Sequence, residues 1–268
     1  MPVVQAFVSS IGPAEPLGVS VVVPVYNSAA SLDELCERIV STMNATLGPE
    51  PWELILVNDG SEDTSWDRVV ALSGEHPEIR GIDLTRNWGQ HNALLAGIHA
   101  ARGEVVVTLD DDLQNPPEEI PRLIEALGPQ LDVVYGVPIA VRQPVYRRMG
   151  AAAVRATIGA LTRRREVALA TGFRALRGEI ADDLPETSGR RVALDGLLRT
   201  ATVRFGSIAV DHQPRRDGRS NYNLARLARL AVTEVATDLR PRGRVTGRTQ
   251  SYRIRTVTEP RLSDDGRV

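Results

Sequence analysis

Three consecutive aspartates follow directly on an apolar run, in VVVTLDDDLQNPP from Val105 to Pro117. The run is short and rich in valine, which predicts a buried strand, and the Pro-Pro pair predicts a break after it. Carboxylates crowded at the end of a buried strand repel one another and lose hydration, so they are tolerated mainly where a cation compensates them. We interpret the segment as a cation site rather than as an acidic turn in solvent.

The spacing Asp-x-Asp-x-Gln within this segment suggests which side chains bind the ion. Alternation along an extended strand would place Asp110, Asp112 and Gln114 on one side of the chain. Three oxygen donors suit a hard divalent ion, with water and substrate phosphates completing its shell. We therefore expect Mg²⁺ or Mn²⁺, bound to a diphosphate, at these three residues.

Strand-like and helix-like segments alternate through the first half of the chain, which predicts an α/β fold with a mostly parallel, doubly wound sheet and helices on both faces. In such sheets ligands gather at the carboxyl ends of the strands, where the polar clusters of this sequence fall. Ser31 is expected to cap the first helix, which begins at residue 32. The expected strands are residues 19–25, 53–57, 79–84, 104–109 and 132–135, with strand-like 168–180 and 200–210; the later expected helices span 64–73, 87–101, 117–127, 144–165, 192–199 and 224–239.

The ends of the chain differ in composition from its middle. Residues 1–17 contain Gly and Pro, which predicts an irregular leader. We expect residues 18–240 to form a single domain. Residues 241–268 are rich in arginine and are expected to be a disordered tail. No stretch approaches the roughly 20 apolar residues of a membrane-spanning helix. Cys36 is the only cysteine, which excludes a disulfide framework and favours the cytoplasm.

Charge is distributed unevenly although the formal net charge is only -2. Residues 1–137 carry 6 arginines against 21 Asp and Glu, whereas the remainder carries 26 against 13. This split predicts an acidic, cation-binding half and a basic half that faces an anion. The chain contains no lysine, which disfavours any mechanism that needs a catalytic lysine.

Four motifs occur in order along the chain: VVVPVYN (21–27), VNDGSED (57–63), LTRNWGQHNALLAGI (84–98) and TLDDDLQNPPEEIPRL (108–123). Together they resemble the family 2 glycosyltransferases of GT-A fold, and within that family the polyprenyl-phosphate sugar transferases. The resemblance covers about residues 19–230. It implies a nucleotide-sugar donor.

The resemblance implies that the first three motifs line the nucleotide pocket. Asp59 would accept from the base N3–H, as a carboxylate behind a strand is able to do. Asp110 would lie near the ribose, while Asp112 and Gln114 would hold the metal ion. The other implied donor contacts are Pro24, Tyr26, Asn27, Arg86 and Asp111, with Gln90 and His91 close to the sugar.

Two later segments carry further implied contacts. The segment 212–222, HQPRRDGRSNY, resembles a family segment that folds over the donor diphosphate; Arg215, Ser220 and Tyr222 match it, and Asn221 replaces its usual lysine. Arginines there pair with phosphate oxygens and neutralise charge on the departing UDP. Arg142 and Arg147 loosely match the family's basic segment for the lipid phosphate.

The expected reaction is an inverting, metal-dependent transfer from a nucleotide sugar, with UDP favoured over other nucleotides, to a polyprenyl phosphate. A phosphate monoester is already anionic at neutral pH, so it needs no strong base. One alternative is a hydroxyl acceptor on a small molecule or glycan, with Asp195 as the general base. Another is a catalytically silent nucleotide-binding protein.

The expected partners follow from the same interpretation. Arginine-rich amphipathic helices predict peripheral contact with the inner face of an anionic membrane in place of membrane-spanning helices. We expect no nucleic-acid partner, and the sequence carries no signal for the oligomeric state.

Overall fold

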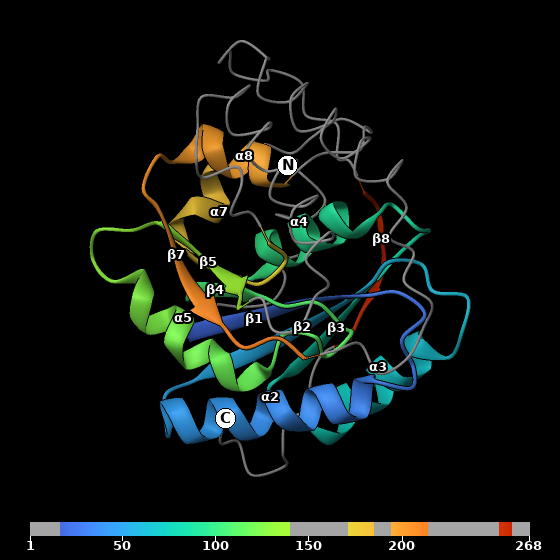
Figure 1. Ribbon diagram of the computed structural model, residues 1–268. Helices are drawn as coiled ribbons and strands as arrows, with labels where there is room; N and C mark the ends of the chain where they lie inside the picture. Colours follow the sequence, from blue (N-terminus) through green and yellow to red (C-terminus); the bar gives the residue numbers. More distant parts are fainter. Residues whose placement is uncertain (1–16, 140–170, 185–193, 214–251, 259–268) are drawn as a thin grey trace, which may run out of the picture.

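The computed structural model describes residues 17–139, 171–184, 194–213 and 252–258 (Figure 1). Their strands form one eight-stranded sheet in the order β7-β5-β6-β4-β1-β2-β3-β8. β6 and β8 run antiparallel to their neighbours, while the remaining pairs are parallel. The strands are β1 Leu17–Val25, β2 Trp52–Asn58, β3 Ile79–Leu84, β4 Gly103–Thr108, β5 Val133–Pro138, β6 Arg174–Arg177, β7 Phe205–Val210 and β8 Ile254–Val257.

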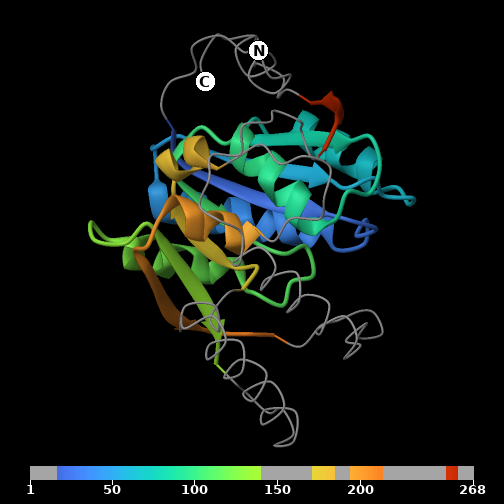
Figure 2. The same ribbon diagram turned by 90° about the horizontal axis from the view of Figure 1, so that it is seen from above.

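Helices cover both faces of the sheet, as the alternating pattern predicts (Figures 1 and 2). α2, α3 and α5 pack on one face, and α4, α7 and α8 pack on the other, so the core consists of two apolar layers separated by the sheet. The helices are α2 Leu32–Leu47, α3 Ser65–Glu75, α4 Gln90–Ala100, the 3-10 turn η1 Pro117–Glu119, α5 Ile120–Leu127, α7 Glu179–Asp183 and α8 Leu194–Ala201.

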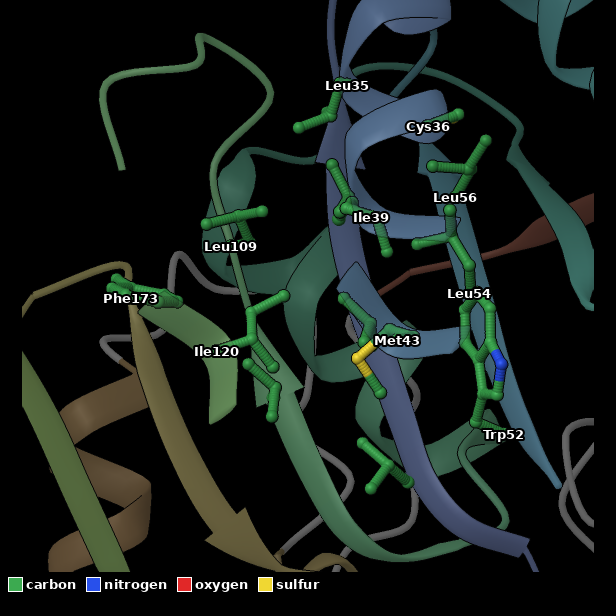
Figure 3. Packing of buried hydrophobic residues seen from close by; sticks show 14 of the residues in the cluster. Leu35, Cys36, Ile39, Met43, Trp52, Leu54, Leu56, Leu109, Ile120 and Phe173 are labelled. Carbon is green, nitrogen blue, oxygen red and sulfur yellow. The ribbon is translucent and has the colours of Figure 1, made fainter. Parts of the chain in front are cut away.

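The layer beneath α2 illustrates why the chain folds in this way. Leu35, Ile39 and Met43 recur at helical spacing and are fully buried against the sheet (Figure 3). β2, WELILVN, is buried along its whole length, as expected for a strand with helices on both faces. Each such leucine or isoleucine contributes about 1.5–3 kcal/mol through burial.

Two local expectations need correction. Ser31 occupies the N-cap position of α2 as expected, but its side chain makes no capping hydrogen bond. Its hydroxyl proton is shared between the backbone oxygens of Ser28 and Asp111. Within the expected disordered tail, residues 254–257 form β8, which pairs with β3. Arg255 bonds the buried Asp83 carboxylate there, and Tyr252 is buried, so this stretch has the apolar and ionic contacts that ordering requires.

The parallel strands all end on the same side of the sheet. We call this side, where the carboxyl ends of the strands lie together, the carboxyl edge. Because β6 is antiparallel to β4 and β5, it starts at the edge where they end. β7 ends there too, and β8 starts opposite Leu84, the last residue of β3. The two long connections, 139–173 and 211–253, therefore both leave and return at the carboxyl edge. The expected helices at 144–165 and 224–239 lie outside the described residues.

Candidate functional site

Part of the predicted nucleotide-sugar site lies at the point where the strand order of the sheet reverses. β1 lies between β4 and β2, so the carboxyl ends of β1 and β4 form the switch point of the sheet. Doubly wound folds bind their ligands in a crevice at this point. Tyr26 and Asn27 follow β1, and the three aspartates follow β4. Pro24 lies within β1, opposite Val57.

The aspartates lie in a turn rather than in a strand. β4 ends at Thr108, two residues before Asp110, so the expected alternation of Asp110, Asp112 and Gln114 does not apply. Leu113 takes a left-handed backbone conformation, with φ 59°. The Gln114 amide donates to Asp112 Oδ1 at 3.1 Å, which is a tight local turn. We call residues 110–114 the acid turn.

Asp111 connects the acid turn to the loop after β1. Its Oδ2 accepts from the Tyr26 amide at 3.1 Å and from the Ser28 hydroxyl. The Ser31 hydroxyl donates to its backbone oxygen at 3.0 Å. Desolvation raises the pKa of the Asp111 carboxyl, while these hydrogen bonds lower it. Asp111 therefore links the acid turn after β4 to the loop after β1.

Asn27 connects the same loop to the loop after β2. Its backbone has φ 53°, a left-handed conformation that asparagine tolerates better than most residues. Its amide donates to Ser61 Oγ at 3.0 Å, and its Oδ1 accepts from the Glu62 amide at 2.8 Å. Tyr26 beside it is 43% exposed, so its ring is available to a ligand.

Asp59, at the end of β2, is already engaged by the protein. Its Oδ1 accepts from the Trp88 amide at 2.6 Å and its Oδ2 from the Gly89 amide at 2.9 Å. It is 3% exposed, and desolvation raises its pKa to about 6 although both amides lower it. A base N3–H would have to share one of these oxygens. Arg86 lies close by, stacked over the Trp88 ring at 4.0 Å.

Asp110 is held by the first turn of α4 and by the chain that enters β6. Gln90 Nε2 donates to Asp110 Oδ1 at 2.6 Å. A Cβ on Gly172 would lie 2.5 Å from Asp110 Oδ2, so the backbone there packs directly on the carboxylate. Desolvation, followed by the charges of Asp112 and Asp111, raises the Asp110 pKa to about 6.

The chain after β7 runs into the acid turn. The Gln213 amide donates to the Gln114 backbone oxygen at 2.8 Å, and His212 Nδ1 lies 3.3 Å from Asn115 Oδ1. Desolvation lowers the His212 pKa, and the charge of Asp112 raises it. The segment 212–222 thus begins against the acid turn, while Arg215, Ser220 and Tyr222 themselves, like Arg142 and Arg147, lie outside the described residues.

Asp195, the candidate general base, is buried in an ion pair. It is 5% exposed in the first turn of α8, and its Oδ1 accepts from Arg174 Nη1 at 2.5 Å and from the Tyr135 hydroxyl at 2.8 Å. His91, which we expected near the sugar, accepts from the Leu194 amide at 3.3 Å, and burial lowers its pKa. Sequence reasoning missed Arg174 and Tyr135. Tyr135 is the one polar side chain of β5, whereas Arg174 begins the short strand β6, which also contains Arg177, so Arg174 carries no distinguishing local signal.

The oxygen atoms of the acid turn fit a divalent cation that is bound jointly by the protein and by a phosphate-bearing ligand. Among the described residues, no three His, Cys, Asp or Glu side chains are grouped so as to bind an ion on their own. Asp110 and Asp112 nevertheless repel each other in a desolvated turn. Mg²⁺ is usually held by one or two carboxylates together with substrate phosphates, which matches this arrangement.

Comparison with solved structures identifies the fold as that of the GT-A glycosyltransferases. One similar structure is glucosyl-3-phosphoglycerate synthase from Mycobacterium tuberculosis, solved with Mn²⁺, UDP-glucose and phosphoglyceric acid. It superposes with a TM-score of 0.60 at 19% identity, and the match covers 89% of this chain and 84% of that one. A Pyrobaculum calidifontis mannosyltransferase, solved with GDP-mannose and Mn²⁺, gives 0.58 at 19% identity over 89% and 70%. The glycosyl transferase family 2 model matches residues 20–196, and the chain belongs to that family.

Within the family, the chain is similar to a group of curated transferases. The undecaprenyl-phosphate 4-deoxy-4-formamido-L-arabinose transferase of Pectobacterium carotovorum is 38% identical over 213 residues, and that of Yersinia pestis is 36% identical. The match covers 79% of this chain and spans 64% of the length of these relatives. No helix within the described ranges is long and apolar enough to cross a membrane.

Proposed function

We propose that the chain transfers a sugar from a UDP-sugar to a polyprenyl phosphate with Mg²⁺ or Mn²⁺ at the acid turn. The observation that carries this proposal is the position of Asp110 and Asp112 directly after β4, beside the carboxyl end of β1 at the switch point of the sheet. A nucleotide diphosphate placed there lies beside the loops of Tyr26 and Asp59. The names of the 36–38% identical relatives support the choice of acceptor.

In this proposal Asp112, Asp110 and Gln114 hold the metal ion together with the donor's diphosphate. When bound, the ion supplies a positive charge that stabilises the departing diphosphate. Arg215, in the segment that begins against the acid turn, adds a bidentate contact to the same phosphates. The residues that surround the nucleotide are Pro24, Tyr26, Asn27, Asp59, Arg86, Asp111, Ser220 and Tyr222.

The state of Asp195 favours a phosphate acceptor over a hydroxyl. A hydroxyl needs a base that is free to take its proton, but Asp195 is buried and accepts from Arg174 and Tyr135. A phosphate oxygen attacks the anomeric carbon as an anion, the bond from that carbon to the UDP oxygen breaks, and UDP leaves with the electron pair. No proton has to move.

The two ends of the connection 139–173 support the same assignment, because both lie at the carboxyl edge. Arg142 and Arg147 fall within this connection in the sequence. We assign them to the acceptor phosphate. Contact with an anionic membrane surface through the basic half of the chain would deliver the lipid to this edge.

The decisive experiment compares a short-chain polyprenyl phosphate with the polyprenol of the same chain length. UDP release from a panel of UDP-sugars is measured with Mn²⁺, with Mg²⁺ and with EDTA. The proposal expects metal-dependent release that the phosphate stimulates and the alcohol does not. Stimulation by the alcohol would establish the hydroxyl alternative, and UDP binding without any turnover would establish a silent nucleotide-binding protein.

A further inference from the structure

Arg174, in β6, is the largest of the fully buried side chains within the described residues, with 1% exposure. It pairs with Asp195, which is almost equally buried. Replacing such a pair by apolar residues of similar volume often leaves a protein as stable or more stable. Burying a charged pair carries a desolvation penalty, so its presence in the core suggests a role other than packing.

The register of the sheet connects this pair to the acid turn. Thr108 in β4, Arg174 in β6 and Tyr135 in β5 lie directly opposite one another across three strands. Residues opposite one another in paired strands share a face of the sheet. Arg174 also lies over the Tyr135 ring at 5.5 Å, and Tyr135 donates to the same Asp195 oxygen. One row of side chains thus runs from α8 to the strand end that carries Asp110.

The backbone next to Arg174 contacts the acid turn itself. Gly172, two residues earlier, packs on the Asp110 carboxylate, and Thr108 Oγ1 donates to its backbone oxygen at 2.6 Å. Arg174 is therefore connected to Asp110 through the backbone of residues 172–174.

We propose that Arg174, anchored by Asp195 and Tyr135, is a positioning residue that fixes the Asp110 carboxylate beneath the donor diphosphate. The inference rests on the proposed donor site. Arg174 contacts neither substrate in this assignment and acts through Asp110. Asp195 then serves as the anchor of Arg174 and not as a proton acceptor.

The test is the substitution Arg174→Met, which removes the charge and keeps most of the volume. Loss of a residue that orients a metal ligand typically costs about 10- to 100-fold in metal affinity or activity. We expect losses of that size in the apparent Mn²⁺ affinity and in kcat/KM for the donor, with an unchanged KM for the acceptor. UDP release measured in separate titrations of Mn²⁺, of the donor and of the acceptor gives these three quantities in turn.

The matched control is Arg80→Met. Arg80 is another buried arginine, and it pairs with Glu53 at 2.9 Å near the start of β3, at the opposite edge of the sheet. Its loss is expected to lower the melting temperature while leaving the Mn²⁺ dependence of the folded protein unchanged. Equal shifts of the Mn²⁺ dependence in both variants would mean that Arg174 acts only on stability, and would overturn the inference.

If Arg174→Met does not fold, the variant Arg174→Lys tests the same inference. It keeps the charge but not the planar geometry of the guanidinium, so we expect a folded protein with weakened Mn²⁺ dependence. Wild-type Mn²⁺ and donor constants in this variant would refute the inference. The proposed function fails separately, if the wild-type protein itself neither binds UDP with Mn²⁺ nor transfers a sugar.

Discussion

The side-chain amide of Gln90 donates to Asp110 Oδ1 at 2.6 Å and so joins the first turn of α4 to the acid turn. The two residues lie 20 positions apart in the sequence, one at the start of a helix and the other beyond the end of a strand. Gln90 thereby fixes one oxygen of a carboxylate whose other oxygen packs against Gly172. The orientation of Asp110 is set before any donor arrives.

Gln90→Leu is therefore expected to lower kcat/KM for the donor about 10-fold, because Asp110 loses the bond that orients it. Metal-dependent UDP release measures the effect. Gln130→Leu, on the exposed loop before β5, is the control and is expected to match the wild-type protein. Equal activity in the two variants would show that Asp110 needs no such support.

Gly172→Ala is expected to abolish most activity while the protein stays folded. The new methyl group would lie 2.5–2.6 Å from both carboxylate oxygens of Asp110, so the acid turn has to shift. Circular dichroism and UDP release together check this outcome. The control Gly74→Ala, in α3 where a Cβ meets nothing within 4 Å, should retain activity and gain about 0.5–1 kcal/mol of stability.

Asp59 predicts a pH dependence of stability. Its pKa is about 6 in the folded chain and near 3.8 when unfolded, so the folded chain binds more protons between these values. The contribution is fully present below about pH 3.8 and is lost as pH rises through about 6. The difference between the two pKa values corresponds to at most about 3 kcal/mol.

Urea denaturation from about pH 4.5 to about pH 7.5 measures this contribution by comparing the wild-type protein with Asp59→Asn. The unfolding free energy of the wild-type protein, relative to that of the variant, should fall as pH rises through about 6. A difference that stays constant over this range would contradict the raised pKa of Asp59.

Arg255→Ala is expected to destabilise the fold by about 1–2 kcal/mol, because it removes a charged partner from a buried carboxylate. Arg255 Nη1 bonds Asp83 Oδ2 at 2.9 Å, and Asp83 is 1% exposed. Chemical denaturation checks the value, with the exposed Arg253→Ala as the control in the same segment. An equal effect of both variants would mean that β8 adds no specific ionic contact.

Much of the sheet could be predicted from the sequence because its parallel strands are continuous apolar runs. The strand at residues 79–84 is confirmed at both ends, and the other four expected strands shift by at most three residues at either end. The strand-like segments 168–180 and 200–210 shorten to β6 and β7. β6 and β8 escaped prediction as antiparallel partners, since a four-residue strand carries little pattern and its direction depends on neighbours distant in the sequence. Pairing between distant segments has no local signal.

The positions of site residues in loops that directly follow strands could be predicted from the sequence. Contacts between a side chain of a helix and a side chain of the sheet could not. Asp110 and Tyr26 could be placed at one edge because parallel strands end together. The alternation argument for Asp112 was wrong because β4 stops at Thr108 and a turn has no period of two. The contact of Asp195 with Arg174 joins a helix to a strand, and hydrophobic periodicity does not encode such a contact.

The antiparallel direction of β6 makes most of the connection 139–173 replaceable. The connection joins two hydrogen-bonded neighbouring strands, which lie about 5 Å apart. A segment of another length closes the same gap at a small entropic cost, since that cost grows only with the logarithm of loop length. Replacement of the chain between Ile139 and Thr171 is therefore expected to leave the pairing of β5 with β6 and the contact of Gly172 with Asp110 unchanged.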